Sequence, residues 1–439
     1  MDSGVLTPVR TPSGRLRYEP SPKPDAVALC LSGGGFRNAL FHLGAVRRLN
    51  ELGILYQVTT VSAVSGGATL AAHLAKTCHR WSSGPLDSES WEREISAPFR
   101  RITSENLSAR AVLKGWLPWY WVTDRAVETL ARDMEERGLG AMPLDSLPKE
   151  PRFIFCATDL VSGTQWLFDR SSDEQWNVST AAAVSSWLLP PFTGSKFRRV
   201  SLADGGVADY RGVEPVWQTH DTLLVSDGGD MFQPQWGQSM LWSMTRLAAT
   251  VSHHAQLYQK RWLLSLLESG QFKGGYWSID RSPLTFQTDR STRFYGYSPA
   301  LARDVIATIR IDYDEISTAE AAVLENHGYL LAEAATRTDP NLNYLRTVDA
   351  PLRIPHPAWL AEHKVRRELR DSARKIWLGR GRGRALSGRA EAALNEPLPT
   401  DGRYAPPPLS PQPPQPPLPS LPSLPEKVDA PTPGVEEHV

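Results

Sequence analysis

The stretch from Ala26 to Asn38, AVALCLSGGGFRN, decides the fold. Its first six residues form an apolar run that is typical of a strand buried on both faces. Three glycines interrupt the run, and residues 36–53 then carry apolar side chains at helical spacing. A second strand pattern at 57–63 and a second helical pattern at 68–81 follow. The chain therefore begins β-α-β-α, which is the order of a parallel sheet with crossover helices.

Later segments extend this α/β pattern. The segment from about Ser317 to Thr338 is expected to be a helix, because Ser317 and Glu320 fit a capping box. Residues from about 92 to 147 have helical character without strand-like runs, and they are expected to form a helical insertion over the sheet. Further strands are predicted at 153–158, 198–203, 222–226 and 307–312.

Composition excludes several classes of protein. The 439 residues are 41% hydrophobic and 22% charged, which is ordinary for a globular protein with a sizeable core. Basic and acidic residues number 48 each, so the net charge favours neither nucleic acid nor a membrane as partner. No apolar run is long enough to span a membrane, and a cytoplasmic location is the default expectation. Cys30, Cys78 and Cys156 lack metal-binding or disulfide-framework spacing, which predicts buried, reduced thiols.

The two ends of the chain differ from its middle. Residues 1–24 hold several Pro, Ser and Gly and predict an extended segment before a folded domain at 25–345. Residues 396–439 are rich in proline, which predicts a disordered tail of polyproline type. Its PxxP spacings make an SH3-like domain a candidate partner, although a passive tail is the commoner outcome.

Residues 346–395 are expected to form a basic helical segment. Between Lys364 and Arg389, ten basic residues accompany only Glu368 and Asp371, while apolar residues recur at near-helical spacing. One interpretation is an amphipathic helix that lies on anionic lipid through residues 358–390. The other, commoner arrangement is a helix packed on the core with a solvated basic face. No nucleic-acid partner is expected.

Two serines follow the second predicted strand, and only one fits a nucleophile. A serine on a sharp strand-to-helix turn needs small residues two positions before and after it. Around Ser65 these positions hold Ala63 and Gly67, whereas around Ser62 they hold Thr60 and Val64, which are both β-branched. Ser65 is therefore the candidate nucleophile, and the alternative is an ordinary turn.

The triple glycine at 33–35 lies between the first strand and the first helix. Its amides can point into a cleft beside the end of the next strand, where they could form an oxyanion hole for Ser65. A flexible turn and a phosphate cradle are the alternatives. The cradle is disfavoured, because the sequence lacks Gly-Lys-Ser/Thr and has Asn38 where the dinucleotide fingerprint needs a last glycine.

Two carboxylates are candidates for the general base. Asp204 and Asp227 each follow a predicted strand and begin an Asp-Gly-Gly turn, so the residues alone do not separate them. His42 and His73 lie on helical patterns among apolar residues, and both are expected to be hydrogen-bonded core histidines.

The order of these motifs resembles the patatin-like phospholipase family, which shares its catalytic arrangement with cytosolic phospholipase A2. The family's oxyanion motif is similar to Gly33–Asn38, its nucleophile motif to Ala63–Gly67, and its Asp-Gly-Gly/Ala motif to Asp204–Gly206. The segments 157–160 and 185–192 are also similar to the family's. The resemblance spans roughly 26–227. The chain departs from the usual family residues at Asn38, Ala63 and Tyr210.

The resemblance implies a three-layer α/β/α fold with a mostly parallel central sheet. It also implies that Asp204 is the base and that Asp227 is structural. The expected activity is lipid acyl hydrolysis through an acyl-enzyme, on phospholipids or other lipid esters, without a metal or other cofactor. The expected oxyanion donors are the amides of Gly33, Gly34, Gly35 and Gly66.

Three further expectations concern lipid contact. Arg37 either reaches a substrate phosphate or anchors its own loop. The aromatic cluster Trp116–Trp121 is a candidate for peripheral membrane contact, with buried packing as its alternative. The alternative for the whole chain is a catalytically silent adaptor that keeps the fold and binds a membrane or a protein partner.

Overall fold

The computed structural model describes residues 9–10, 16–17, 23–107, 125–172, 176–187, 201–229, 232, 239–286, 294–372 and 388–396. All of them lie in the compact unit Met1–Ala405. The described strands are β1 (Val9–Arg10), β2 (Leu16–Arg17), β3 (Lys23–Leu31), β4 (Thr60–Val64), β5 (Arg152–Asp159), β6 (Thr164–Phe168), β7 (Leu202–Asp204), β8 (His220–Asp227) and β9 (Lys273–Ser278).

The described helices are α1 (Gly35–Glu51), α2 (Gly66–Lys76), α3 (Cys78–Trp81), α4 (Ser88–Trp91), α5 (Ala97–Thr103), α7 (Arg125–Met134), α8 (Val178–Ser185), α9 (Met240–Glu268), α10 (Pro299–Asp304), α11 (Thr318–Thr338), α12 (Glu362–Ser372) and α13 (Gly388–Asn395). Short 3₁₀ or π turns occur at η1 (Leu55–Gln57), η2 (Glu92–Ser96), η4 (Glu135–Leu139), η5 (Leu144–Ser146), η6 (Gly205–Val207), η7 (Pro283–Thr285), η8 (Ile306–Thr308), η9 (Pro340–Leu345) and η10 (Pro357–Trp359).

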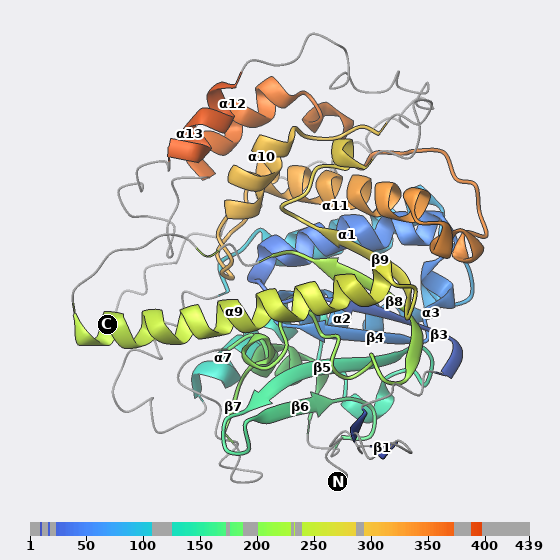
Figure 1. Ribbon diagram of the computed structural model, residues 1–439, viewed down its shortest axis with the longest axis vertical. Coiled ribbons are helices and arrows are strands. Elements are labelled where there is room, and N and C mark those ends of the chain that lie inside the picture. Colours follow the sequence, from blue (N-terminus) through green and yellow to red (C-terminus); the bar gives the residue numbers. More distant parts are fainter. Residues whose placement is uncertain are drawn as a thin grey trace, which may run out of the picture. The chain divides into compact units, whose positions relative to one another are not determined.

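A mostly parallel sheet forms the centre of the fold (Figure 1). Its strands lie in the order β6-β5-β4-β3-β8-β9, and β7 also pairs with β5. The neighbours from β5 to β9 along this order are parallel, while β6 and β7 run antiparallel to β5. The parallel arrangement predicted from the sequence is confirmed.

Both faces of the sheet are covered, because alternate residues of its strands point to opposite sides. Leu29 and Leu31 of β3 belong to the larger buried cluster, together with residues of α1, α2, α8 and α11. Ala28 and Cys30 belong to a second cluster on the other face, with residues 213–217 and the C-terminal part of α9. The fold is therefore the predicted three-layer α/β/α arrangement.

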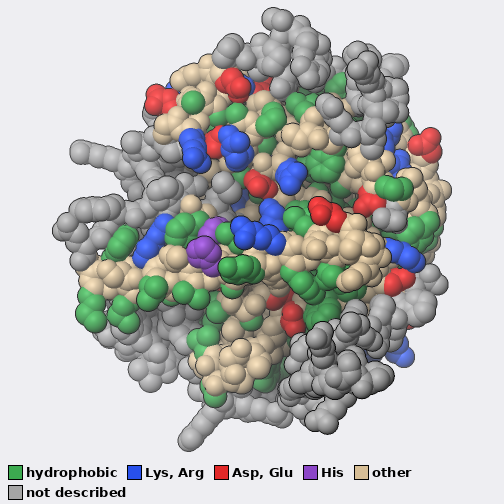
Figure 2. Space-filling model, viewed as in Figure 1, with side chains coloured by type: hydrophobic (Ala, Val, Ile, Leu, Met, Phe, Trp, Pro, Cys, Tyr) green, Lys and Arg blue, Asp and Glu red, His purple; other side chains and the backbone are tan. Residues whose placement is uncertain are grey.

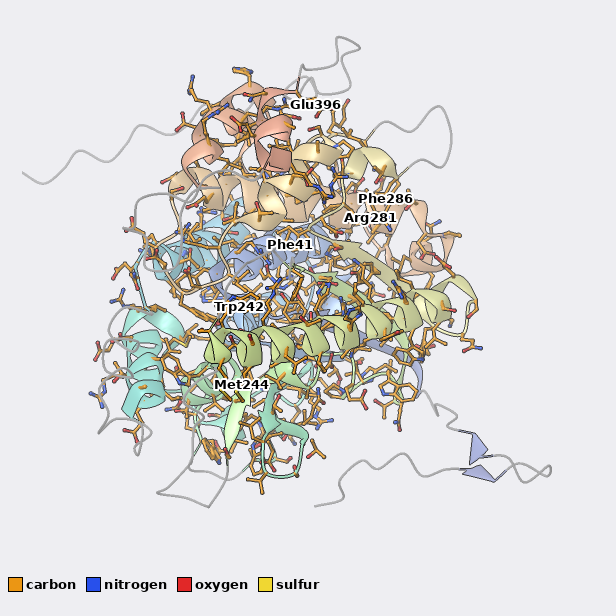
Figure 3. All side chains as sticks on the ribbon, turned by 60° about the vertical axis from the view of Figure 1, so that its left-hand side comes forward. Phe41, Trp242, Met244, Arg281, Phe286 and Glu396 are labelled. Carbon is orange, nitrogen blue, oxygen red and sulfur yellow. The ribbon has the colours of Figure 1, made fainter. Side chains whose placement is uncertain are left out.

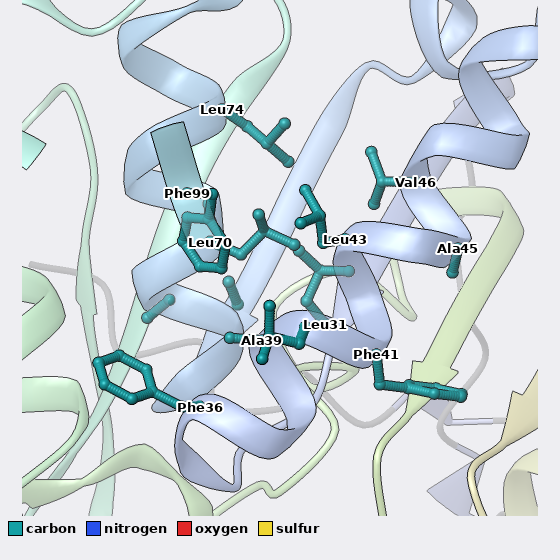
Figure 4. Packing of buried hydrophobic residues seen from close by; sticks show 14 of the residues in the cluster. Leu31, Phe36, Ala39, Phe41, Leu43, Ala45, Val46, Leu70, Leu74 and Phe99 are labelled. Atoms are coloured by element: carbon teal, nitrogen blue, oxygen red, sulfur yellow. The ribbon is translucent and has the colours of Figure 1, made fainter. Parts of the chain in front are cut away.

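The core of the first face packs two helices against β3. Figure 4 shows Leu31, Leu43 and Leu70, from β3, α1 and α2, meeting in this cluster. Burying a leucine side chain contributes about 2 kcal/mol to folding.

Glycines allow the helices α1 and α11 to cross at close range. A Cβ on Gly44 would lie 1.9 Å from the Glu325 carbonyl oxygen, and one on Gly328 would lie 1.8 Å from that of Phe41.

Several predicted elements are confirmed and others are not. The helix from Ser317 has its full capping box, and the described part of the insertion at 92–147 is helical. The strand predicted at 307–312 is wrong. There the chain forms η8 and then an irregular segment whose carbonyl groups bond to α1, through the Arg37 side chain and the Phe36 amide. The strands β6 and β9 were not predicted. The segment 1–24, predicted as extended, contains the antiparallel pair β1–β2 and the start of β3.

The basic segment packs on the core in its described part. Val365 and Leu369, on the apolar side of α12, are fully buried, and the Ser372 hydroxyl donates to Glu320 of α11 over 2.6 Å. The apolar side of α12 is therefore not open to lipid, which corrects the expectation of a membrane-binding helix for residues 358–372. Residues 373–387, the cluster Trp116–Trp121 and the proline-rich tail lie outside the described residues. No helix in the described ranges is both long and apolar enough to cross a bilayer.

The three cysteines are buried and unpaired, as predicted. Burial raises the pKa of the Cys156 thiol to about 12, and it raises the pKa of Cys30 and Cys78 as well. The thiols therefore remain protonated at neutral pH.

Candidate active site

Ser65 lies on a sharp turn between β4 and α2. Its backbone angles are φ 49° and ψ −118°, and it is the one residue other than glycine with positive φ in the described part of the chain. Such a conformation costs about 1–3 kcal/mol and persists only where its surroundings enforce it. The surroundings here are tight. A Cβ on Gly66 would lie 2.0 Å from the Gly35 carbonyl oxygen, and one on Gly67 would lie 2.4 Å from that of Leu31. The strand-to-helix turn predicted at Ser65 is confirmed.

Ser62 has a different environment. It lies inside β4, is fully buried, and its hydroxyl contacts the Cys156 thiol at 3.6 Å. Its side chain therefore serves packing within the sheet.

The helix α8 supports the turn. The Ser65 amide donates to the Ser185 hydroxyl over 2.8 Å, and that hydroxyl donates to the Cys156 carbonyl oxygen over 2.6 Å. Ser185 thus ties the Ser65 backbone to β5. The same serine belongs to the segment 185–192 that resembles the family.

The glycine loop lies directly against Ser65. A Cβ on Gly33 would come within 3.3 Å of the Ser65 Cβ. Gly34 and Gly35 have φ values of 121° and 59°, which favour glycine. Gly35 and Gly66 begin α1 and α2, where the first amides of a helix have no partner within the helix. No described residue accepts a hydrogen bond from the amides of Gly34, Gly35 or Gly66.

Gly33 differs from the other expected oxyanion donors. Its amide donates to the Tyr210 carbonyl oxygen over 2.9 Å. The expectation that this amide serves the oxyanion is therefore corrected: it is used to hold the loop, which leaves Gly34, Gly35 and Gly66 as candidates.

Val64, the residue before Ser65, and Asp204 lie at successive positions along one edge of β5. On this edge β4 pairs with β5 up to Val64, which lies opposite Cys156. From the next residue of β5 onward, the same edge pairs with β7, and Asp204 lies opposite Ala157. Successive positions in a strand are about 3.3 Å apart, so Asp204 lies beside the point where Ser65 leaves β4.

The turn after β7 fixes the Asp204 carboxylate. Its Oδ1 accepts from the Gly206 amide over 2.7 Å, and its carbonyl oxygen accepts from the Thr158 hydroxyl over 2.8 Å. Gly205 allows this approach, since a Cβ there would lie 2.2 Å from the Cys156 carbonyl oxygen. The close contact with β5 therefore explains why glycine follows Asp204.

Asp227, the second carboxylate, is engaged elsewhere. Arg211 Nε donates to its Oδ2 over 2.7 Å, and the Gly229 amide donates to its Oδ1 over 2.8 Å. Burial opposes ionisation, yet the positive charges of Arg211 and Lys260 lower the pKa of Asp227 to about 2. These contacts fit the structural role that the resemblance implied.

Tyr313 also lies in the site, although nothing in the sequence predicted it there. Its hydroxyl donates to Ser186 over 2.6 Å and lies 3.2 Å from the Thr69 hydroxyl. Burial raises the pKa of Tyr313 to about 12; the charge of Asp204 adds to the rise, and hydrogen bonding with the Ser65 side chain opposes it. Because the Thr69 hydroxyl also donates to the Ser65 carbonyl oxygen over 3.5 Å, Thr69 links the phenol to the Ser65 turn. Tyr313 lies just beyond the segment 307–312 that the sequence predicted to be a strand.

Arg37 is fully engaged with the protein. Its guanidinium donates to four backbone carbonyl groups, two in the 307–309 segment and two at Gly228 and Gly229, while Nε donates to Asn38. These contacts use its five N–H groups. The geometry favours the loop-anchoring alternative, and it corrects the expectation that Arg37 reaches a substrate phosphate.

His42 and His73 are core residues, as predicted. Burial lowers the pKa of both His42 and His73 to about 4. His42 contacts the Ser226 hydroxyl at 2.7 Å, and His73 contacts the Ile95 carbonyl oxygen at 3.0 Å.

Comparison with known proteins identifies a family for this fold. Residues 29–217 match the family model described as patatin-like phospholipase. Over this range the chain is similar to patatin-like phospholipases. Ser65 and Asp204 both lie inside the matched range. No curated protein sequence matches the chain significantly.

Three solved structures show remote similarity to this chain. VipD from Legionella pneumophila is 16% identical, with a TM-score of 0.32, over 76% of this chain and 70% of VipD. Human GIVD cytosolic phospholipase A2 is 16% identical, with a TM-score of 0.24, over 39% of this chain and 30% of that one. ExoU in complex with SpcU from Pseudomonas aeruginosa gives 14% identity and a TM-score of 0.23, over 80% and 81% of the two chains.

Proposed function

We propose that the chain is a lipid acyl hydrolase that uses Ser65 as nucleophile and Asp204 as general base. The observation that carries the proposal is the meeting of three features: a strained serine at a strand-to-helix turn, a carboxylate one position further along the same strand edge, and amides of Gly34, Gly35 and Gly66 without a described acceptor. The family match to patatin-like phospholipases supports lipid esters, phospholipids among them, as the substrate class.

In the first half of the proposed reaction, Asp204 accepts the hydroxyl proton of Ser65 while Oγ attacks the ester carbonyl carbon. The carbonyl oxygen becomes an oxyanion, which accepts hydrogen bonds from the amides of Gly34, Gly35 and Gly66 at the starts of α1 and α2. When the tetrahedral intermediate collapses, the C–O bond to the alcohol breaks. The alcohol takes the proton from Asp204, and the acyl group remains on Ser65.

In the second half, water replaces the alcohol. Asp204 accepts a proton from the water as its oxygen attacks the acyl carbon, and the same amides hold the second oxyanion. Collapse breaks the bond to Oγ, which takes the proton back from Asp204. The fatty acid leaves and Ser65 is restored. Tyr313 acts here as a positioning residue, because its hydroxyl contacts the Thr69 hydroxyl, which in turn donates to the Ser65 carbonyl oxygen over 3.5 Å.

The test is hydrolysis of a short-chain nitrophenyl ester and of phospholipid vesicles by three variants. Ser65→Ala and Asp204→Asn are each expected to reduce turnover of both substrates by at least about a thousandfold. Ser62→Ala is the matched control, since Ser62 lies three residues earlier, inside β4, and it is expected to retain activity. Full activity of Ser65→Ala or Asp204→Asn would refute the dyad, and inactivity of the wild-type chain on both substrates would favour the silent-adaptor alternative.

A further inference from the structure

The helix α9 presents an apolar row to solvent. Met240, Met244, Leu247, Val251 and Tyr258 are each 60–80% exposed. Their spacings of four, three, four and seven residues place them on one side of the helix. We call these five residues the α9 stripe. Figure 2 shows hydrophobic side chains along one edge of α9, and Figure 3 shows Met244 on its N-terminal part.

In its middle part α9 meets the protein through polar groups, whereas Leu263, Leu266 and Leu267 near its C-terminus pack in the second core cluster. The Gln256 carbonyl oxygen accepts from Arg211 over 2.9 Å, and the Gln259 side chain donates to Asp209 over 2.8 Å. Among the described side chains of the helix, Leu263 is the one that is fully buried. The apolar residues of the stripe therefore contribute little to the core, and packing does not explain them.

The stripe lies at the end of the sheet that carries the candidate site. The helix connects β8 to β9, which are parallel, so α9 runs against the strand direction and begins at their carboxyl ends. Its 29 residues span about 43 Å, whereas the eight residues of β8 span about 26 Å. Because α9 leads into β9 after four residues, the excess length projects at the N-terminal end (Figure 1).

The charged residues of α9 are mostly basic. Arg246, Lys260 and Arg261 accompany a single acid, Glu268, at the last position of the helix. Figure 2 shows Lys, Arg and His side chains along the edge opposite the hydrophobic one. Trp262 packs on Trp217 with a ring separation of 5.3 Å and remains partly exposed, next to the stripe. Arg261 is exposed and lies beside the stripe. An exposed apolar row with an aromatic flank and a basic neighbour is a composition that binds an anionic bilayer surface.

We propose that the α9 stripe docks on the surface of an anionic phospholipid bilayer and thereby brings the Ser65 end of the sheet to the membrane. Its apolar side chains enter the boundary between headgroups and acyl chains while the exposed Arg261 remains at headgroup level. This proposal rests on the proposed function. It adds the surface from which a lipid ester would reach the site.

A second copy of the chain is a poorer fit as occupant of this surface. Continuing the stripe at seven-residue spacing from Leu247 reaches His254 and Arg261, where a coiled-coil seam would need apolar residues. The uninterrupted apolar row covers only Met240 to Val251, shorter than the three or four heptads typical of a coiled coil.

The experiment measures binding of the full chain to vesicles by flotation, separately from catalysis. The vesicles contain phosphatidylcholine alone or phosphatidylcholine with phosphatidylserine. The test variant is the triple Met244→Ser, Leu247→Ser, Val251→Ser. The control is Tyr344→Ser with Val348→Ser, at exposed apolar positions near the opposite end of the sheet, where Tyr344 bonds to Thr222 at the start of β8. All proteins carry Ser65→Ala, so that hydrolysis does not change the vesicles.

The expected result is binding to the anionic vesicles that the triple variant reduces about tenfold or more, with little change in the control. Equal binding of triple variant and reference, or no binding of the reference protein, would overturn the proposal. It would also be overturned if light scattering showed a dimer that the triple variant disrupts while vesicle binding persists. With Ser65 restored, turnover of a short-chain nitrophenyl ester is expected to be unchanged in the triple variant. If the proposed function is wrong, the chain with Ser65 restored would lack ester turnover while the reference protein would still bind the vesicles.

Discussion

Asn38 Nδ2 donates a hydrogen bond to the Tyr210 hydroxyl over 3.1 Å. Both residues depart from those usual in the patatin-like family, and they contact each other. A Cβ on Gly33 would lie 3.3 Å from the Tyr210 ring, and one on Gly206 would lie 3.2 Å from it. The ring therefore packs between the glycine loop and the Asp204 turn. The two departures form one contact that joins both halves of the candidate site.

Removing the Tyr210 hydroxyl should weaken this junction. Tyr210→Phe is expected to lower the free energy of unfolding by about 1–2 kcal/mol, because the buried Asn38 amide and the Gly229 carbonyl oxygen each lose a partner. Urea unfolding measures the loss. A double-mutant cycle with Asn38→Ala should show coupling of about 1 kcal/mol, and additive effects would contradict a direct link.

Tyr313 should affect turnover more than substrate binding. Tyr313→Phe removes the hydroxyl that contacts Thr69 and Ser186 beside the Ser65 turn, and it is expected to lower kcat about tenfold or more with a smaller change in KM. The control is Tyr297→Phe, a buried tyrosine whose hydroxyl donates to the Trp359 carbonyl oxygen. Equal effects of the two variants on kcat would mean that Tyr313 acts only through stability.

The Ser185 hydroxyl should contribute both to the stability of the Ser65 turn and to activity. Ser185→Ala removes the acceptor of the Ser65 amide, and Ser179→Ala removes a similar 2.6 Å bond to the Gly140 carbonyl oxygen from the same helix. Both variants are expected to lose about 1 kcal/mol of unfolding free energy. Only Ser185→Ala should lower kcat, by about tenfold, since it alone frees the strained turn. Unchanged kcat in Ser185→Ala would show that the turn holds without this bond.

The Asp227 ion pair should make the fold sensitive to acid. The folded-state pKa of about 2 lies below the ordinary value of 3.8, so the pair stabilises the fold above about pH 4 and this stabilisation is lost as the pH falls toward 2. From about pH 5 to about pH 3, the wild type should lose about 1 kcal/mol that Asp227→Asn does not lose. Urea unfolding at both pH values tests this, with Asp221→Asn on the same strand as control. Parallel losses in wild type and Asp227→Asn would contradict it.

Much of the fold was predictable because its signals are local. The buried strands at 26–31 and 153–158 are apolar runs, and the Ser65 turn follows from the small residues two positions away on either side. The segment at 307–312 also alternates apolar and polar residues, yet its carbonyl groups bond to Arg37, some 270 residues earlier. That long-range contact has no local signature.

The site was predictable only in part for the same reason. The Gly33 amide donates to the Tyr210 carbonyl oxygen, and Tyr313 contacts Thr69 beside the Ser65 turn from a distant segment. Both facts depend on tertiary packing. The exposure of the α9 stripe likewise depends on which side of the helix faces the sheet. The apolar residues of α9 alone do not distinguish a buried side from an exposed one.

The most direct test of the account is covalent labelling of the intact chain by a fluorophosphonate, with the modified residue located by mass spectrometry. The account predicts a single adduct on Ser65, slowed strongly in Asp204→Asn and absent in Ser65→Ala, while Ser62→Ala labels like the wild type. An adduct on another residue, or equal labelling of Ser65 in Asp204→Asn, would contradict the proposed pairing of serine and aspartate.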